Sequence, residues 1–126
     1  VYTRALVADR LGEIELVEND LRKILSLYPN DADALNALGY SLTNFTSRYE
    51  EAYQLIRRAL ELKSDSFYIL DSMGWVYFKL GDLRSSIFYL EKAYELSQDE
   101  EITQHLVEVL NANGEFEKAR LILEKS

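Results

Sequence analysis

The sequence contains no cysteine, one proline and five glycines among its 126 residues. The absence of cysteine excludes disulfides, thiolate metal ligands and cysteine nucleophiles. So little proline and glycine disfavours a sheet with many turns and favours long helices joined by short connections. The sequence also lacks an apolar run near the length of about 18 residues that spans a membrane, and it lacks a signal-peptide pattern. We therefore expect no direct membrane insertion of this segment.

Positive charge is also scarce, because 14 basic residues face 22 acidic ones and the formal net charge is -8. No block of lysine and arginine offsets this balance, so nucleic acid and anionic membrane surfaces are disfavoured as partners. A neutral, apolar or basic polypeptide is easier to accommodate. With 48% hydrophobic residues the chain is not disordered and can bury one continuous core.

Similar segments recur along the chain at a spacing close to 34 residues. The segment 36–40 (NALGY) resembles the segment 71–75 (DSMGW), 35 residues later. The segment 49–52 (YEEA) corresponds to 83–86 (LRSS) after 34 residues and to 116–119 (FEKA) after 33 more. A period of this size predicts a solenoid of repeated helical pairs, an architecture that usually binds other molecules rather than transforming them.

Apolar periodicity and turn signals predict eight helical segments. Their expected ranges are 1–10, 13–28, 32–46, 49–63, 67–80, 83–97, 100–112 and 116–125. Pro29-Asn30-Asp31 is a stop and restart signal, and Ser64-Asp65-Ser66 offers N-cap candidates.

Two patterns indicate how the helices pack. Small residues lie seven apart in second helices, which allows close approach of a neighbour; they are Ala52 and Ala59, then Ser86 and Ala93. Apolar stripes follow one face of two first helices and are predicted to be core; they are Leu35, Leu38, Leu42 and Phe45, then Leu70, Met73, Tyr77 and Leu80.

These residues resemble the tetratricopeptide repeat, a helix-turn-helix unit whose first helix carries Leu-Gly followed by an aromatic residue. The resemblance implies an all-α, right-handed superhelical solenoid of antiparallel helix pairs with about 3.5–4 repeats. We expect one domain over 1–126, with repeats near 1–31 (partial), 32–66, 67–99 and 100–126 (partial). Two departures are that Pro29 is the only closing proline and that Val107 replaces the usual glycine.

A finer resemblance is to the C-terminal repeats of large bacterial tetratricopeptide proteins, many of which are exported or lipid-anchored. The chain begins at Val1 rather than methionine, so we expect it to be part of a longer protein. The compartment stays open between the bacterial cytoplasm and, where the full chain carries an export signal, the periplasm or outer membrane.

A second stripe on the first helices is the predicted binding site. By resemblance it lines the concave groove that holds a peptide or protein segment. The predicted partner-binding residues are Asp33, Asn36, Tyr40, Tyr68, Asp71, Trp75, Phe78 and Glu108. Asp71 and Glu108 stand where the family's carboxylate clamp has basic residues, so we predict no such clamp. An acidic, aromatic groove suits an apolar segment with lysine or arginine. The alternative is that Trp75 and Phe78 pack against the second helix of the preceding repeat.

We expect no catalytic, cofactor or metal site in this chain. His105 is the single histidine; it lies three residues before Glu108 but lacks further ligands in sequence, which favours a surface histidine. The predicted function is a non-catalytic interaction scaffold or adaptor. Two alternatives remain: a self-association module that dimerises through its repeat ends, and an appended module of an enzyme whose catalytic domain lies outside this chain.

Overall fold

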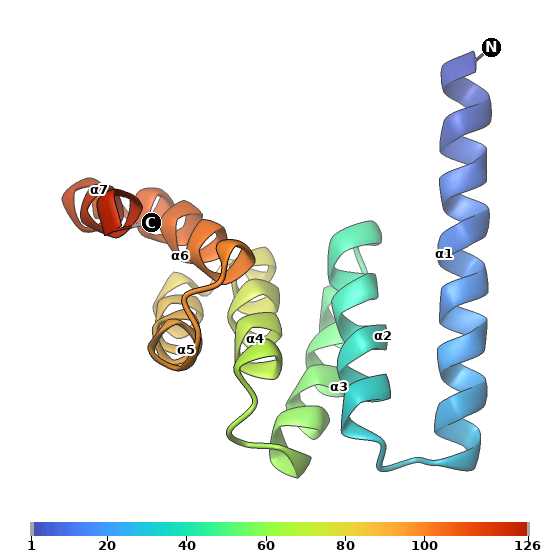
Figure 1. Cartoon of the computed structure of the whole chain (residues 1–126). Coiled ribbons are helices and arrows are strands. Elements are labelled where there is room, and N and C mark those ends of the chain that lie inside the picture. The colour runs from blue at the N-terminus through green and yellow to red at the C-terminus, as the bar shows by residue number, and fades with distance from the viewer. Residues whose placement is uncertain (1, 126) are drawn as a thin grey trace.

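The computed structural model describes the backbone of residues 2–125 and the side chains of residues 12–125. Over this part of the chain the fold is entirely helical (Figure 1). The helices are α1 (Tyr2–Leu27), α2 (Ala32–Phe45), α3 (Tyr49–Leu62), α4 (Phe67–Leu80), α5 (Leu83–Leu96), α6 (Glu100–Ala112) and α7 (Phe116–Lys125).

The helices form stacked pairs, α2 with α3, α4 with α5, and α6 with α7, and α1 packs against α2. Each pair contacts the next through its second helix, α3 on α4 and α5 on α6. The first helices also touch directly, α2 with α4 and α4 with α6, whereas α3 and α5 do not meet within the described residues. Because successive first helices contact one another and successive second helices of the described part of the chain do not, the stack of pairs curves toward the first helices. The first helices α2, α4 and α6 therefore form the inner layer. The predicted helical solenoid is confirmed.

Six of the eight predicted segments end within one residue of the observed helices. The first two are wrong, because residues 1–10 and 13–28 were expected as separate helices, whereas α1 runs without a break from Tyr2 to Leu27. Gly12 lies in its interior and is exposed. Glycine lowers helix stability by about 1 kcal/mol relative to alanine but keeps its N–H donor, so it does not end a helix by itself.

Aspartates begin three of the helices, and the first of them, Asp31, belongs to the predicted stop and restart signal. The side chains of Asp31, Asp82 and Asp99 each accept a hydrogen bond from a backbone N–H in the first turn of the helix that follows. Ser66 occupies the same position before α4, but its side chain makes no capping hydrogen bond, and its Oγ is buried without a hydrogen-bond partner in the described structure. The capping role predicted for Ser66 is therefore wrong.

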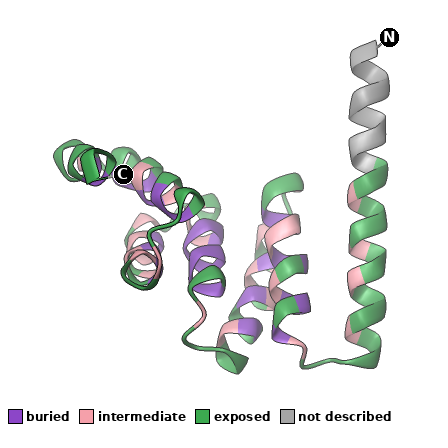
Figure 2. Ribbon diagram, viewed as in Figure 1, coloured by how far each residue is buried: buried purple, intermediate pink, exposed green. Residues whose placement is uncertain are grey.

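The core lies where the two helices of a pair approach closely (Figure 2). The predicted small residues are all fully buried: Ala52, Ala59, Ser86 and Ala93. The predicted apolar stripes are buried over most of their length. Their last residues, Phe45 and Leu80, are instead 57% and 39% exposed. Both stand at the C-terminal ends of first helices, beyond the turns that carry the small residues of the neighbouring helix.

Glycines in α2 and α4 face these small residues. A Cβ atom on Gly74 would lie 2.6 Å from Leu90 Cγ and 3.0 Å from the carbonyl oxygen of Ser86. Gly39 stands in the same relation to Ile56, at 2.5 Å. The Ser86 hydroxyl donates a hydrogen bond of 2.7 Å to the Gly74 carbonyl oxygen, so the two backbones are also linked by a buried polar contact. A side chain at either glycine would force the helices apart.

Ion pairs link α1 to the turn between α2 and α3. Arg48 donates through two nitrogens to the Glu18 carboxylate, at 3.1 Å each, and also bonds Glu51. Arg22 joins Glu51 at 2.6 Å. Arg48, followed by Arg22, lowers the pKa of Glu18, and Arg22, followed by Arg48, lowers the pKa of Glu51. The network orients α1 more than it stabilises the fold, because three of its four side chains are more than 40% exposed.

We predict that Gly74→Ala destabilises the protein although alanine favours helices. Inserting a methyl group into this close approach costs about 1–3 kcal/mol, which outweighs a gain in helix propensity of about 1 kcal/mol or less. Urea unfolding followed by far-ultraviolet circular dichroism measures the difference. Gly12→Ala is the matched control, because nothing lies within 4 Å of a Cβ there. It should leave stability unchanged or raise it, and an equally stable Gly74→Ala variant would contradict the role of Gly74.

Candidate partner-binding face

Trp75 lies at the centre of the inner layer and is only 8% exposed. Its indole Nε1 donates a hydrogen bond of 2.9 Å to Asn44 Oδ1 at the end of α2. Its ring stacks on His105 of α6, with centroids 4.0 Å apart and planes 17° apart, and Phe78 packs beside it at 5.2 Å. Lys79 Nζ lies 5.0 Å from the centroid of the ring. One α4 side chain thus joins three successive first helices.

Asp71, one turn before Trp75, is also buried and pairs with His105. The distance from His105 Nδ1 to Asp71 Oδ1 is 2.8 Å, and the two side chains are 12% and 7% exposed. Burial raises the pKa of Asp71 above its usual range, and the hydrogen bond from His105 partly offsets this effect. The pair satisfies a carboxylate that would otherwise be buried without a partner.

Tyr40 of α2 reaches past α4 to α6. Its hydroxyl donates to Glu101 Oε1, and its ring centroid lies 6.4 Å from that of His105. Burial, followed by the hydrogen bond to Glu101, raises the pKa of Tyr40. We call Tyr40, Asp71, Trp75, Glu101 and His105 the inner cluster.

A second, more accessible group lies near the N-terminal ends of α2 and α4. The Tyr68 hydroxyl donates a hydrogen bond of 2.7 Å to Asp33 Oδ1, and Lys63 Nζ lies 3.1 Å from the same carboxylate. These contacts, Tyr68 first, lower the pKa of Asp33. Tyr68 is 39% exposed, so part of its side chain is accessible from solvent.

The eight predicted partner-binding residues therefore fall into three groups. Tyr40, Asp71 and Trp75 belong to the inner cluster, and half-buried Phe78 packs against it. Asp33 and Tyr68 form the accessible group. The other two are Asn36, whose Oδ1 is buried without a hydrogen-bond partner in the described structure, and Glu108, which is exposed about two turns along α6 from Glu101.

The alternative interpretation of Trp75 is partly correct. Trp75 is buried, as that interpretation expects, but its hydrogen bond and ring stacking go to the neighbouring first helices α2 and α6. The expectation of a surface His105 is wrong, because it is half-buried between Asp71 and Trp75. The repeat period could have indicated this pairing, because Asp71 and His105 are 34 residues apart and so stand at equivalent positions of successive repeats.

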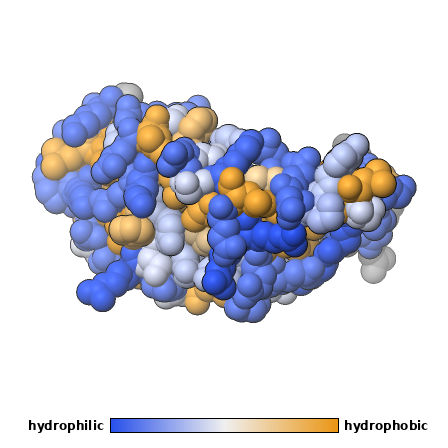
Figure 3. Space-filling model, turned by 90° about the horizontal axis from the view of Figure 1, so that it is seen from below, coloured by the Kyte–Doolittle hydropathy of each residue, from blue (hydrophilic) through white to orange (hydrophobic). Residues whose placement is uncertain are grey.

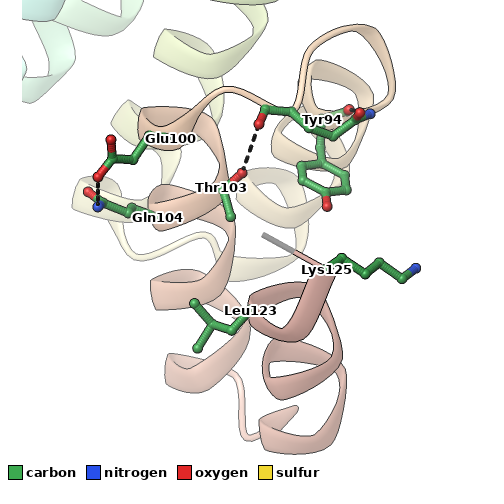
Figure 4. Close-up of a pocket in the computed structure, with 7 residues that line it drawn as sticks. Tyr94, Glu100, Thr103, Gln104, Leu123 and Lys125 are labelled. Atoms are coloured by element: carbon green, nitrogen blue, oxygen red, sulfur yellow. Dashed lines mark hydrogen bonds between the residues drawn. The ribbon is translucent and has the colours of Figure 1, made fainter.

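A cavity of about 710 Å³ lies elsewhere, between α5, α6 and α7 (Figure 4). None of the eight predicted residues lines it. Its lining consists of Tyr94, Gln98, Glu100, Thr103, Gln104, Leu123 and Lys125. Several of its polar groups bond one another, for example Gln104 Nε2 with Glu100 Oε1 at 3.2 Å. The cavity therefore does not carry the candidate site.

Among the described residues, no helix combines the length and apolar character that crossing a membrane requires. Together, the paired helices and the face formed by α2, α4 and α6 define a helical-repeat solenoid. Residues 68–100 match the tetratricopeptide repeat family, and the predicted resemblance to this family is confirmed. Residues 68–100 are thus a tetratricopeptide repeat, and the helix pairs on either side of them have the same arrangement.

Two relatives carry the same repeat name. A TPR repeat-containing protein of Pseudomonas aeruginosa is 43% identical over 108 residues, which are 86% of this chain and 18% of the relative. A TPR repeat-containing protein of Methanocaldococcus jannaschii is 28% identical over 103 residues, 82% of this chain and 18% of the relative. The chain thus spans less than a fifth of the length of these relatives.

Solved structures show the same fold. A MamA fragment from Desulfovibrio magneticus RS-1 superposes with a TM-score of 0.79 at 20% identity, covering 98% of this chain and 70% of that one. PilF of Pseudomonas aeruginosa gives 0.75 at 25% identity, covering 95% and 55%. Tetratricopeptide-repeat proteins generally serve as protein-interaction scaffolds and are generally non-catalytic.

We predict that Trp75→Ala destabilises the fold by about 3–5 kcal/mol, because truncating a buried tryptophan leaves a large cavity. Phe88→Ala is the matched aromatic control, since Phe88 is 53% exposed on α5, and it should cost less than about 1 kcal/mol. Urea unfolding by circular dichroism compares the two. Equal costs would mean that Trp75 is not part of the core.

Proposed function

We propose that this chain is a non-catalytic scaffold or adaptor that binds a segment of another protein along the inner face of α2, α4 and α6. The observation that carries the proposal is the inner cluster, which crosses all three helices through Tyr40, Trp75 and His105. A face held by such contacts is ordered before a partner arrives, so less conformational entropy is lost on binding.

The chemistry of this face favours a segment with apolar and basic side chains. Asp33 on α2 and Glu101 and Glu108 on α6 are exposed acids of this face. Tyr68 and the half-buried Phe78 supply aromatic surface next to them. Charge of this sign attracts lysine and arginine and repels a carboxylate, which supports the absence of a carboxylate clamp.

The predicted residues then have two different roles. Tyr68, Phe78 and the exposed acids contact the partner, whereas buried Asp71 and Trp75 keep the face in shape. Lys79 already lies over the rings of Trp75 and Phe78, at 5.0 and 5.7 Å from their centroids. A basic side chain of the partner can make the same kind of cation–π contact with an exposed tyrosine.

The proposal is tested with an array of synthetic peptides that share apolar content and differ in charge. We expect apolar peptides with lysine or arginine to bind more tightly than matched acidic ones, as measured by fluorescence anisotropy. Their affinity should fall with added salt, because exposed charges are screened. We further predict that Tyr68→Ala combined with Glu108→Gln weakens the best peptide roughly 10-fold or more.

Phe88→Ala combined with Glu95→Gln on α5 is the matched control, since it makes the same kinds of change outside the inner layer. It should leave the affinity within about two-fold. A peptide that loses affinity only in the α5 variant would move the site to the outer face. Binding that ignores peptide charge would contradict the acidic-groove chemistry. Tyr68 is preferred to Trp75 here, because truncating Trp75 damages the core.

Self-association is a second candidate, favoured by apolar side chains exposed on the terminal helices. On α1, Leu16 and Leu27 are 64% and 75% exposed, and on α7, Phe116 and Leu123 are 67% and 52% exposed. Figure 3 shows the molecule from below. This face is mostly hydrophilic, with apolar residues in separate patches, one of them at the α1 end. Light scattering across a concentration series separates the two candidates, because a scaffold stays monomeric and a module that pairs through its ends gains mass.

A further inference from the structure

Three potential metal ligands from two repeats converge at the centre of the inner cluster. Asp71, Glu101 and His105 each offer one donor atom, and the three atoms lie within 4.8 Å of one another. Glu101 and His105 are four residues apart on α6 and so share one face of that helix. Asp71 reaches them from α4. The pair that the sequence suggests, His105 with Glu108, is not the one that forms this group.

We propose that Asp71, Glu101 and His105 bind a divalent first-row transition metal ion of the Zn²⁺ class on the inner face. The proposal does not rest on the proposed function, although Glu101 belongs to both sites. Imidazole nitrogen together with carboxylate oxygen suits Zn²⁺, Co²⁺ and Ni²⁺, whereas Mg²⁺ and Ca²⁺ prefer sites made of oxygen alone.

The distances fit a shared ion. Metal–nitrogen and metal–oxygen bonds to such ions are about 2.0–2.2 Å, so two donors on one ion are separated by about 3.0–3.4 Å. Nδ1 of His105 and Oδ1 of Asp71 are already 2.8 Å apart. A shift of a few tenths of an ångström brings this pair to bonding geometry, provided that the imidazole proton moves to Nε2. The three donor atoms lie within 4.8 Å of one another, so the exposed Glu101 side chain makes the larger movement toward the ion. Three protein ligands leave the remaining coordination positions to water.

The surroundings also resemble those of protein metal sites. The Tyr40 hydroxyl donates to Glu101, which is how an outer residue orients a ligating carboxylate. Trp75 covers one face of the His105 ring and limits its rotation. Asp71 is nearly buried, so its negative charge is poorly hydrated and gains more from a cation than an exposed acid does.

The chain contains an intrinsic fluorescent probe for this site. Trp75 is the single tryptophan and His105 the single histidine, and their rings are 4.0 Å apart. Titration of tag-free protein with Co²⁺ should quench the tryptophan fluorescence with one ion per chain, because a paramagnetic ion bound at His105 lies close to the indole. Diamagnetic Zn²⁺ should displace Co²⁺ and restore the signal, and Ca²⁺ should not. Bound Zn²⁺ should also raise the melting temperature.

Glu101→Gln is the decisive variant, because Glu101 is exposed and its replacement leaves the core intact. It should weaken Co²⁺ binding roughly 10-fold or more. Glu100→Gln is the matched control, since it removes the same charge from the same first turn of α6, and it should keep the affinity within about two-fold. Circular dichroism checks that both variants are folded. Equal losses in both variants, or no saturable quenching below millimolar Co²⁺, would mean that Asp71 and His105 form a hydrogen-bonded pair and no metal site.

Discussion

Two of the helix pairs, α2 with α3 and α4 with α5, depend on a close approach between a glycine in the first helix and the turn of the second helix that carries a small residue. At Gly39 and Gly74 a Cβ would fall within 2.6 Å of a branched side chain of the partner helix. This contact sets how near the two helices lie, and therefore how the next pair stacks on them. The repetition of this spacing brings α2, α4 and α6 together on one side, which is the condition for every contact of the inner cluster.

The inner cluster shows that an aromatic stripe along the first helices of such a solenoid can be buried between helices instead of lining an open groove. The sequence predicts that Trp75 and Asp71 line an open groove, but both are buried. Their polar atoms are satisfied by neighbouring first helices, through Asn44 and His105. Buried polar groups are costly when they lack partners, so these contacts favour one relative placement of the three helices. In the proposed function, a partner therefore contacts the exposed residues beside the inner cluster, among them Tyr68 and the acids.

The parts of the fold that could be predicted are those specified by local chemistry. Aspartates before helices, Pro29 and the small residues of α3 and α5 each act over a few residues, and they located most helix ends and the core. The predicted gap between residues 10 and 13, which contains Gly12, is wrong, because glycine weakens a helix without breaking it. His105 was missed for a different reason. Its environment is supplied by Asp71, a residue of the preceding repeat, and no local pattern around position 105 reveals it.

The repeat period itself carries this non-local information. Tyr68 contacts Asp33 and Asp71 contacts His105 across separations of 35 and 34 residues, one repeat each. Tyr40 contacts Glu101 across 61 residues, about two turns short of two repeats, which places its side chain diagonally over α4. One added residue inside a helix rotates everything after it by about 100°, so it would carry His105 away from Asp71. An added residue in a turn leaves the inner faces aligned. The turn between α2 and α3, residues 46–48, is one residue longer than the turn at 81–82 between α4 and α5, and the chain accepts this residue without losing the register on which the inner cluster depends.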